Sequence, residues 1–180
     1  MRKTSTKQLV YAAAAIALAM AASLIKLFEM PMGGSVTLLS MLFVVLIGYW
    51  YGPATGIAAG VAYGVLQFII EPYVFSIPQV LVDYPLAFGA LGLSGLFRNK
   101  KGGLTAGYLV GVAGRCFFSF LSGWIFFGTY AAGYGISAPV YSFLYNASYL
   151  GAEAVLTVLI VNLPPVRKAL LHIKDMAVSS

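Results

Sequence analysis

The chain consists of long apolar stretches separated by short breaks that contain proline, glycine or charged residues. A helix needs about 20 consecutive apolar residues to cross the hydrocarbon core of a bilayer. The breaks separate six stretches, the second of them short, at residues 9–28, 36–49, 53–70, 79–97, 104–127 and 140–163. We therefore predict an all-α polytopic membrane protein, with six transmembrane helices in a single domain over residues 1–180.

Composition excludes the main classes of soluble protein. Of the 180 residues, 61% are hydrophobic and 9% are charged, and the mean hydropathy is +0.90. Soluble domains carry about 25% charged residues, which excludes a soluble enzyme and a nucleic-acid-binding protein. Cys116 is the single cysteine and His172 the single histidine. Because metal sites and nucleophilic triads need several such side chains, we predict no metal, no cofactor and no enzymatic activity.

The first apolar stretch has an alternative interpretation as a secretory signal peptide. Arg2, Lys3 and Lys7 precede it, and Ala19-Met20-Ala21 is similar to a cleavage site. The stretch over residues 9–28 is nevertheless long enough to span a bilayer. We interpret it as the first transmembrane helix.

Basic residues lie on one side of the predicted bundle. Nine of the 11 Lys and Arg residues fall at the N-terminus, between the fourth and fifth helices, or after the sixth: Arg2, Lys3, Lys7, Arg98, Lys100, Lys101, Arg167, Lys168 and Lys174. Loops rich in Lys and Arg remain in the cytoplasm. Both termini are therefore predicted to be cytoplasmic.

Small residues recur at every fourth position in two predicted helices, at Gly52, Gly56, Gly60 and Gly64 and at Gly103, Gly107 and Gly111. Such faces let helix backbones approach closely, so we expect them to form contacts within the chain. The first helix is rich in alanine on nearly all sides, which exceeds the need of one internal contact. Its Ala15 and Ala19 are expected to receive a helix of another protein.

Ionisable side chains within the predicted helices need an explanation, because a charge at the centre of a bilayer costs about 2.5–3.5 kcal/mol on insertion scales. Glu71 lies beside Pro72 at a helix end, where water solvates it. Arg115 and Glu153 are candidates for a structural ion pair between the fifth and sixth helices. Asp83 is the better candidate for a binding site.

Aromatic residues gather on the same predicted side as Asp83; they are Tyr73, Phe126, Phe127, Tyr130, Tyr134, Tyr141, Tyr145 and Tyr149. Rings at a bilayer interface usually form an anchoring belt, and composition alone favours that interpretation. A belt needs neither the Asp83 carboxylate nor the nearby Asn146 amide. A pocket for a planar cation uses both, together with rings that stack on the ligand. The residues alone leave both interpretations open.

Four motifs, in order along the chain, resemble those of one membrane-protein family. They are residues 30–36 (MPMGGSV), 82–95 with Val82-Asp83-Tyr84 and Gly92-Leu93-Ser94-Gly95, 122–128 with Ser122-Gly123 and Phe126-Phe127-Gly128, and 141–149 (YSFLYNASY). Together with six predicted helices, this pattern is similar to the ThiT (YuaJ) family, the thiamine-binding S-components of energy-coupling factor (ECF) transporters. The likeness covers nearly the whole chain.

The resemblance implies a multi-pass protein of the bacterial plasma membrane that captures thiamine on its outer side. It implies as partners one transmembrane coupling protein, which contacts Ala15 and Ala19, and two cytoplasmic ATPases. By position in the motifs, the implied substrate-binding residues are Asp83, Tyr84, Gly123, Phe127, Tyr141, Ser142 and Asn146, with Gly34 and Ser35 in a loop that serves as a lid. Outside the motifs, the resemblance implies Tyr73, ten residues before Asp83, and Ser119 as further substrate-binding residues.

Two residues depart from the family pattern. Ser119 stands where many members carry a histidine, and Phe127 where some carry tryptophan. A serine cannot stack on a ring, which leaves open a thiamine precursor such as the aminopyrimidine moiety, or another vitamin, as the ligand. A solitary channel is a further alternative, and it would transport without ATPases.

Overall fold

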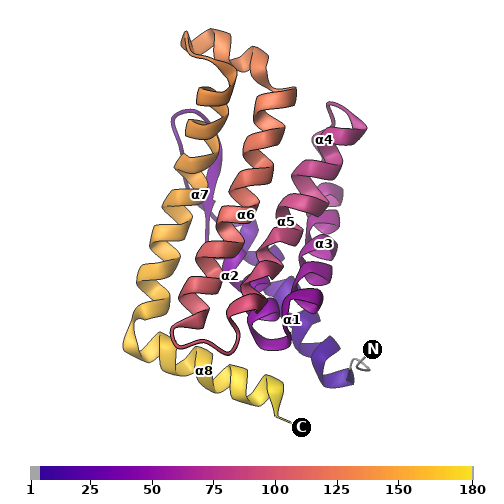
Figure 1. Cartoon of the computed structure of the whole chain (residues 1–180), viewed down its shortest axis with the longest axis vertical. Coiled ribbons are helices and arrows are strands. Elements are labelled where there is room, and N and C mark those ends of the chain that lie inside the picture. Colours follow the sequence, from indigo (N-terminus) through magenta and orange to yellow (C-terminus); the bar gives the residue numbers. More distant parts are fainter. Residues whose placement is uncertain (1–4, 180) are drawn as a thin grey trace.

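Figure 1 shows the computed structural model of the chain, which describes residues 5–179. Its long helices run side by side. They are α1 (Thr6–Ser23), α3 (Pro53–Ile70), α6 (Gly103–Phe126), α7 (Ala138–Asn162) and a composite helix of α4 (Ile77–Leu81), the π-helical turn η1 (Val82–Leu86), α5 (Ala87–Gly89) and the 3-10 segment η2 (Ala90–Phe97). Each of these five is long and apolar enough to cross a membrane.

The remaining predicted span is the short helix α2 (Ser40–Tyr51). Its length of about 18 Å is less than the roughly 30 Å of a hydrocarbon core. Ten of its 12 residues are buried, and it packs against α1, α3, η2 and α6. A helix that is apolar on all sides is stable where protein surrounds it. The six-helix prediction is therefore confirmed, with five long helices around one short central helix.

The segment between α1 and α2 is not helical. In it, β1 (Lys26–Glu29) and β2 (Ser35–Thr37) pair as an antiparallel hairpin, with Glu29 opposite Ser35. The prediction of helix over residues 24–28 and 36–39 is wrong, because hydropathy does not distinguish an apolar strand from a helix in short runs. Gly33 and Gly34 both have positive φ, which permits the tight turn between the strands.

The glycine faces lie inside the protein. A Cβ on Gly56 would collide with the backbone of Gly48 and Gly92, and a Cβ on Gly107 would meet the backbone of Ser94. Helices α3 and α6 therefore both approach the 3-10 segment η2 at backbone distance. The prediction of close contacts within the chain is confirmed.

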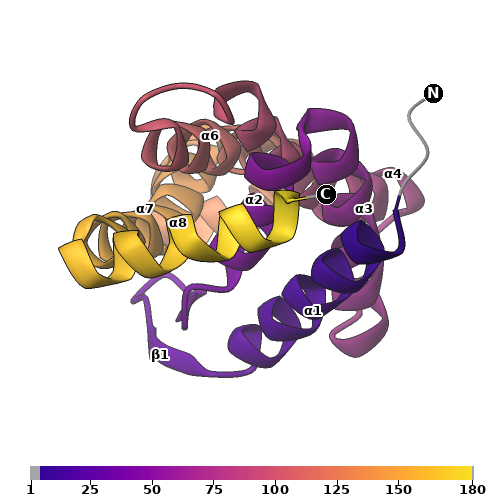
Figure 2. The same ribbon diagram turned by 90° about the horizontal axis from the view of Figure 1, so that it is seen from below.

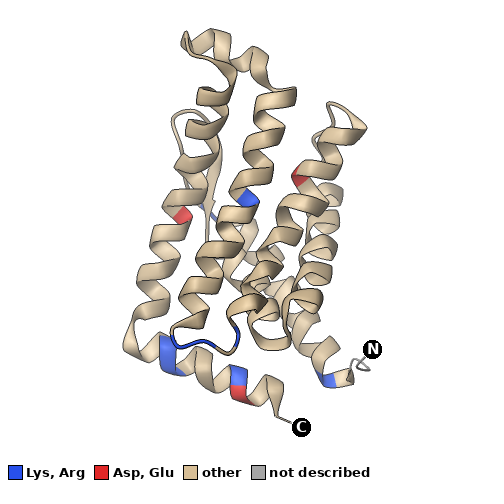
Figure 3. Ribbon diagram, in the orientation of Figure 1, with Lys and Arg blue, Asp and Glu red and all other residues tan. Residues whose placement is uncertain are grey.

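Both ends of the described chain lie at the same end of the bundle (Figure 1). The basic residues at that end, shown in Figure 3, are Lys7, Arg98, Lys100, Lys101, Arg167, Lys168 and Lys174, while Arg2 and Lys3 lie outside the described residues. A further helix, α8 (Pro164–Val178), crosses beneath the bundle (Figure 2). The excess of Lys and Arg identifies this end as cytoplasmic. The opposite end carries the 3-10 segment η3 (Gly128–Tyr134) and faces outward.

Candidate binding site

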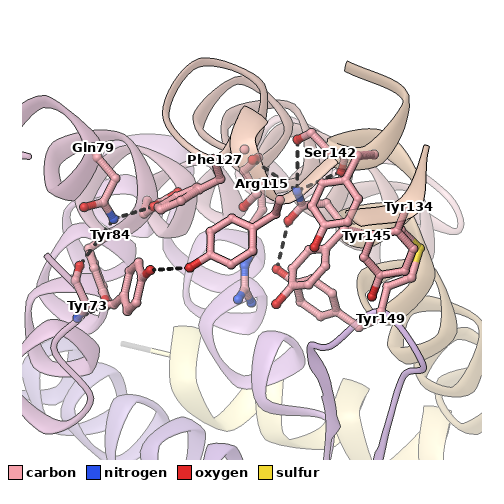
Figure 4. A pocket seen from close by; sticks show the side chains of 16 residues that line it. Tyr73, Gln79, Tyr84, Arg115, Phe127, Tyr134, Ser142, Tyr145 and Tyr149 are labelled. Carbon is pink, nitrogen blue, oxygen red and sulfur yellow. Dashed lines mark hydrogen bonds between the residues drawn. The ribbon is translucent and has the colours of Figure 1, made fainter. Parts of the chain in front are cut away.

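A cavity of about 580 Å³ lies in the outer half of the bundle, among the composite helix, α6, η3 and α7 (Figure 4). Its size is within the range of about 300–1,000 Å³ that is usual for small-molecule sites. The side chains and backbone of 16 residues line it: Met32, Tyr73, Gln79, Asp83, Tyr84, Arg115, Ser119, Gly123, Phe127, Tyr130, Tyr134, Tyr141, Ser142, Tyr145, Asn146 and Tyr149. Nine of the 11 predicted substrate-binding residues are thus brought together around one space.

The other two predicted residues, Gly34 and Ser35, lie in the hairpin and do not line the cavity. The hairpin turn contributes Met32 instead. A Cβ on Gly34 would overlap the ring of Tyr149, so the glycine lets the turn lie directly on one of the cavity's rings. Gly34 therefore supports the cavity wall from behind, and the role of Gly34 and Ser35 in a lid stays a prediction.

Asp83 projects from the π-helical turn η1. Pro85 is the predicted kink in this helix, and because proline lacks a backbone N–H, the regular α-helical bonding is interrupted here. Asp83 Oδ2 accepts a hydrogen bond of 2.6 Å from Gln79 Nε2. Gln79 is itself buried, and its Oε1 accepts from the backbone N–H of Phe75 at 2.9 Å. The Asp83 carboxylate is therefore oriented by the amide of Gln79. Because this partner is uncharged, the pattern of charged residues in the sequence does not indicate it.

Tyr84 and Tyr73 fix the connection between α3 and the composite helix. The Tyr84 hydroxyl donates to the backbone oxygen of Glu71 at 2.9 Å and accepts from the backbone N–H of Tyr73 at 3.1 Å. The hydroxyl of Tyr73 shares a hydrogen bond of 3.3 Å with that of Tyr130. This bond, with a smaller contribution from burial, raises the pKa of Tyr73. Tyr73 therefore lines the cavity as a neutral phenol.

Asn146 and Ser142 on α7 hold that helix against α6. Asn146 Nδ2 donates to the backbone oxygens of Ser119 and Ser142 at 3.2 and 3.0 Å, and its Oδ1 accepts from the Tyr149 hydroxyl at 3.2 Å. A Cβ on Gly123 would overlap Ser142 Oγ, so the glycine is required for this close contact. An amide oxygen has two lone pairs, which leaves one on Asn146 Oδ1 for a ligand.

Aromatic rings form two walls of the cavity. On one side, Tyr134, Tyr141, Tyr145 and Tyr149 follow one another with centroid distances of 5.2, 6.0 and 5.8 Å. On the other, Phe127 lies 5.6 Å from Tyr73 and 6.3 Å from Tyr130, between ring centroids. An anchoring belt would direct its rings outward to the interface, whereas these rings enclose a space. The arrangement has the form of a pocket.

Glu153 does not pair with Arg115, so that prediction is wrong. One oxygen of the Glu153 carboxylate accepts from the backbone N–H and the hydroxyl of Thr37 at 3.1 and 2.8 Å. The other accepts from the Ser40 hydroxyl and the Met41 backbone N–H, both at 3.3 Å. These donors belong to the end of β2 and the start of α2, where helix N–H groups lack partners. The Glu153 carboxylate accepts hydrogen bonds from these donors. Arg115 lines the cavity instead.

Ala15 and Ala19 are 3% and 0% exposed. They belong to the face of α1 that packs inside the protein, and the hydroxyl of Tyr63 donates to the backbone oxygen of Ala19 at 3.3 Å. The prediction that these two alanines receive a helix of another protein is therefore wrong in its choice of face. The exposed face of α1 carries other alanines, among them Ala13, Ala17 and Ala21.

Comparisons with known proteins agree with this architecture. Thiamine transporter ThiT of Bacillus subtilis (strain 168) is 33% identical over 136 residues, which are 68% of this chain and 70% of that protein. Thiamine transporter ThiT of Lacticaseibacillus paracasei is 30% identical over 120 residues, 57% and 59% of the two chains. A solved structure of ThiT from Listeria monocytogenes shares the fold, with a TM-score of 0.71 at 23% identity over 88% of this chain and 94% of that one.

The profile of one protein family, described as "Thiamine transporter protein (Thia_YuaJ)", matches residues 9–173. That range contains all 16 residues that line the cavity and nearly all of the membrane-spanning bundle. The chain therefore belongs to the Thia_YuaJ family of thiamine transporter proteins and is a multi-pass bacterial membrane protein.

Proposed function

We propose that this protein captures thiamine in the outer cavity and acts as the substrate-binding S-component of an ECF transporter. The observation that carries the proposal is a single carboxylate, Asp83, in a cavity walled by aromatic rings, in a chain whose relatives are thiamine transporters. Thiamine joins a cationic thiazolium ring to an aminopyrimidine ring. It therefore offers two flat faces, one positive charge and an amino group that donates hydrogen bonds.

Each of these features has a counterpart in the cavity. The thiazolium and pyrimidine rings stack between Phe127 and the tyrosines of α7, since cations and aromatic faces attract each other. Asp83 balances the positive charge in surroundings of low dielectric constant. The free lone pair of Asn146 Oδ1 accepts from the pyrimidine amino group.

A titration of thiamine into the purified full-length protein in nanodiscs tests this binding mode. Asp83→Asn is expected to weaken binding roughly 30-fold or more, because removing one member of a buried charge pair costs about 2–5 kcal/mol. Asn146→Ala is expected to weaken binding as well. Glu71→Gln, at an exposed acid that does not line the cavity, is the matched control. If Asp83→Asn and Asn146→Ala both bind thiamine with unchanged affinity and have normal melting temperatures, the proposal is contradicted.

The energy for uptake comes from partner ATPases in this proposal, because the sequence contains no Walker-type phosphate loop. The exposed alanines Ala13, Ala17 and Ala21 recur at every fourth residue of α1 and let a helix of the coupling protein approach closely. Ala17→Trp is expected to spare thiamine binding and abolish uptake into proteoliposomes that contain the ECF module. Val155→Trp, at an exposed position on α7, is the control. Uptake that persists in Ala17→Trp contradicts this docking face, and uptake by the chain alone identifies a channel.

Ser119 favours one alternative ligand class. Its side chain lines the cavity, at a position where the resemblance to the family implies a histidine in many members. Because serine is smaller than histidine, more space remains around the ligand. A thiamine precursor such as the aminopyrimidine moiety, or another vitamin, is therefore the second candidate. A competition screen with thiamine, its two separate ring moieties and riboflavin distinguishes these ligands, and the compound that binds most tightly identifies the substrate.

A further inference from the structure

The connection between α3 and α4, residues 71–76, contributes Tyr73 to the cavity wall but has no regular secondary structure. Its residues 71–75 are all exposed. Within the described residues 5–179, no backbone–backbone hydrogen bond joins residues 72–75 to another part of the chain. Because fixing an exposed backbone costs conformational entropy, side chains must hold this connection in place.

Gln79 is a side chain that ties this connection to the helix behind it. It lies on α4 and is 1% exposed. Its Oε1 accepts from the backbone N–H of Phe75 at 2.9 Å, and its Nε2 donates to the backbone oxygen of Tyr73 at 3.3 Å. The same Nε2 donates to Asp83 Oδ2 at 2.6 Å. A primary amide has two N–H donors, so both donors and the oxygen of Gln79 have partners.

These three bonds join two parts of the cavity that differ in their role. Asp83 supplies the negative charge, whereas Tyr73 supplies a ring whose centroid lies 5.6 Å from that of Phe127. Figure 4 shows Gln79, Tyr73 and Tyr84 together on the side of the cavity that lies opposite the tyrosines of α7. Hydrogen bonds that share a polar group polarise and strengthen one another. A ligand that fixes the Asp83 carboxylate is therefore expected to tighten the bonds from Gln79 to the connection.

We propose that Gln79 is a positioning residue through which Asp83 and the connection of residues 71–76 act as one unit in ligand binding. The inference rests on the proposed function, because Asp83 balances the thiamine cation there. Since both N–H donors of Gln79 are in use, Gln79 acts on the ligand through Asp83 and Tyr73. Methionine is unbranched and similar in length to glutamine, so Gln79→Met keeps the packing and removes the three bonds.

A double-mutant cycle on the full-length protein in nanodiscs tests this link. Dissociation constants for thiamine are measured for the unaltered protein, Gln79→Met, Asp83→Asn and the variant with both substitutions. Gln79→Met alone is expected to weaken binding about tenfold, because it removes a hydrogen bond to a charged group. In the Asp83→Asn background it is expected to change the dissociation constant less than about threefold, because substitutions within one network are not additive.

Equal factors in the two backgrounds would show that Gln79 acts independently of Asp83, and they would overturn the inference. Gln67→Met alters an amide of α3 that does not line the cavity, and as the matched control it is expected to leave the affinity unchanged. The same cycle judges the proposed function separately. If Asp83→Asn alone leaves thiamine affinity unchanged, the proposed binding mode fails. If Asp83→Asn weakens binding and Gln79→Met does not, the inference alone fails.

Hydrogen exchange at the Phe75 backbone N–H gives a second readout, which a general loss of stability does not reproduce. In the unaltered protein, saturating thiamine is expected to slow this exchange about tenfold, because Gln79 accepts the hydrogen bond. In Gln79→Met at saturating thiamine, the slowing is expected to fall below about threefold. If Gln79→Met does not fold, the unaltered protein decides: slowed exchange supports the inference, and exchange that thiamine leaves unchanged overturns it.

Discussion

Arg115 lies on α6 and Glu153 on the neighbouring helix α7, both inside the membrane-spanning bundle. The two charged groups differ in how many hydrogen-bond partners surround them. The Glu153 carboxylate is 2% exposed and accepts four hydrogen bonds from residues 37–41. The Arg115 guanidinium stacks on one ring, and its buried Nε has no partner. Buried polar groups in folded proteins are nearly always satisfied. Glu153 therefore serves the fold, whereas part of the hydrogen-bonding capacity of Arg115 stays unused.

The satisfied charge also supports the cavity indirectly. Glu153 lies on α7, one turn beyond Tyr149, and its hydrogen bonds hold the hairpin and the start of α2 against that helix. The same hairpin places Met32 at the cavity. Glu153, which does not line the cavity, therefore helps to position the hairpin that places Met32 there.

The largest expected effect is the loss of this brace in Glu153→Ala. The substitution removes the acceptor of the donors of Thr37, Ser40 and Met41, while the Thr37 and Ser40 hydroxyls keep their bond to each other. Each donor left unpaired in a buried environment costs about 1–3 kcal/mol. We expect a destabilisation of roughly 3–5 kcal/mol, measured by reversible unfolding in mixed micelles. Glu71→Ala removes an exposed acid and is expected to change stability by less than about 0.5 kcal/mol. Similar losses in the two variants would show that Glu153 is not a brace.

A smaller effect is expected when one donor is removed and the carboxylate stays. The Thr37 hydroxyl contacts both Glu153 and the Ser40 hydroxyl, at 2.8 and 2.7 Å. Thr37→Val keeps the shape of the side chain and loses both bonds, of which the one to the carboxylate is worth about 1.5–3 kcal/mol and the one between neutral hydroxyls about 0.5–1.5 kcal/mol. Thermal unfolding should therefore place this variant between Glu153→Ala and the unaltered protein. A loss as large as that of Glu153→Ala would mean that the hydroxyl, and not the set of four bonds, holds the hairpin.

The features that the sequence predicts correctly are those that depend on neighbouring residues along the chain. Hydropathy along the chain is enough to find α3, which begins and ends where expected at Pro53–Ile70, and to place α6 and α7 within one or two residues. Several cavity residues could be gathered because they fall in motifs of one family; they are Asp83, Tyr84, Gly123, Phe127, Tyr141, Ser142 and Asn146. Apolar stretches and motifs are local features of sequence, and these were predicted well.

Contacts between distant residues could not be predicted in the same way. The bonds from Glu153 to Thr37 span 116 positions, and no local pattern marks a carboxylate that caps a helix so far away. The buried face of α1 could not be predicted for another reason, because alanines lie on nearly every side of this helix. Only packing distinguishes the buried Ala15 and Ala19 from the exposed Ala17.

The smallest effect on stability is expected at Arg115, and it is the sharpest test of the contrast with Glu153. Arg115→Leu removes a charge that forms no ion pair with a carboxylate among residues 5–179, and it leaves an apolar side chain against Phe88. Replacing poorly compensated buried charges by apolar groups is often neutral or stabilising. We expect the free energy of unfolding, measured without ligand, to stay within about 1 kcal/mol or to rise. If Arg115→Leu instead destabilises the protein as much as Glu153→Ala, the guanidinium supports the fold as strongly as the Glu153 carboxylate does, and the contrast between the two buried charges fails.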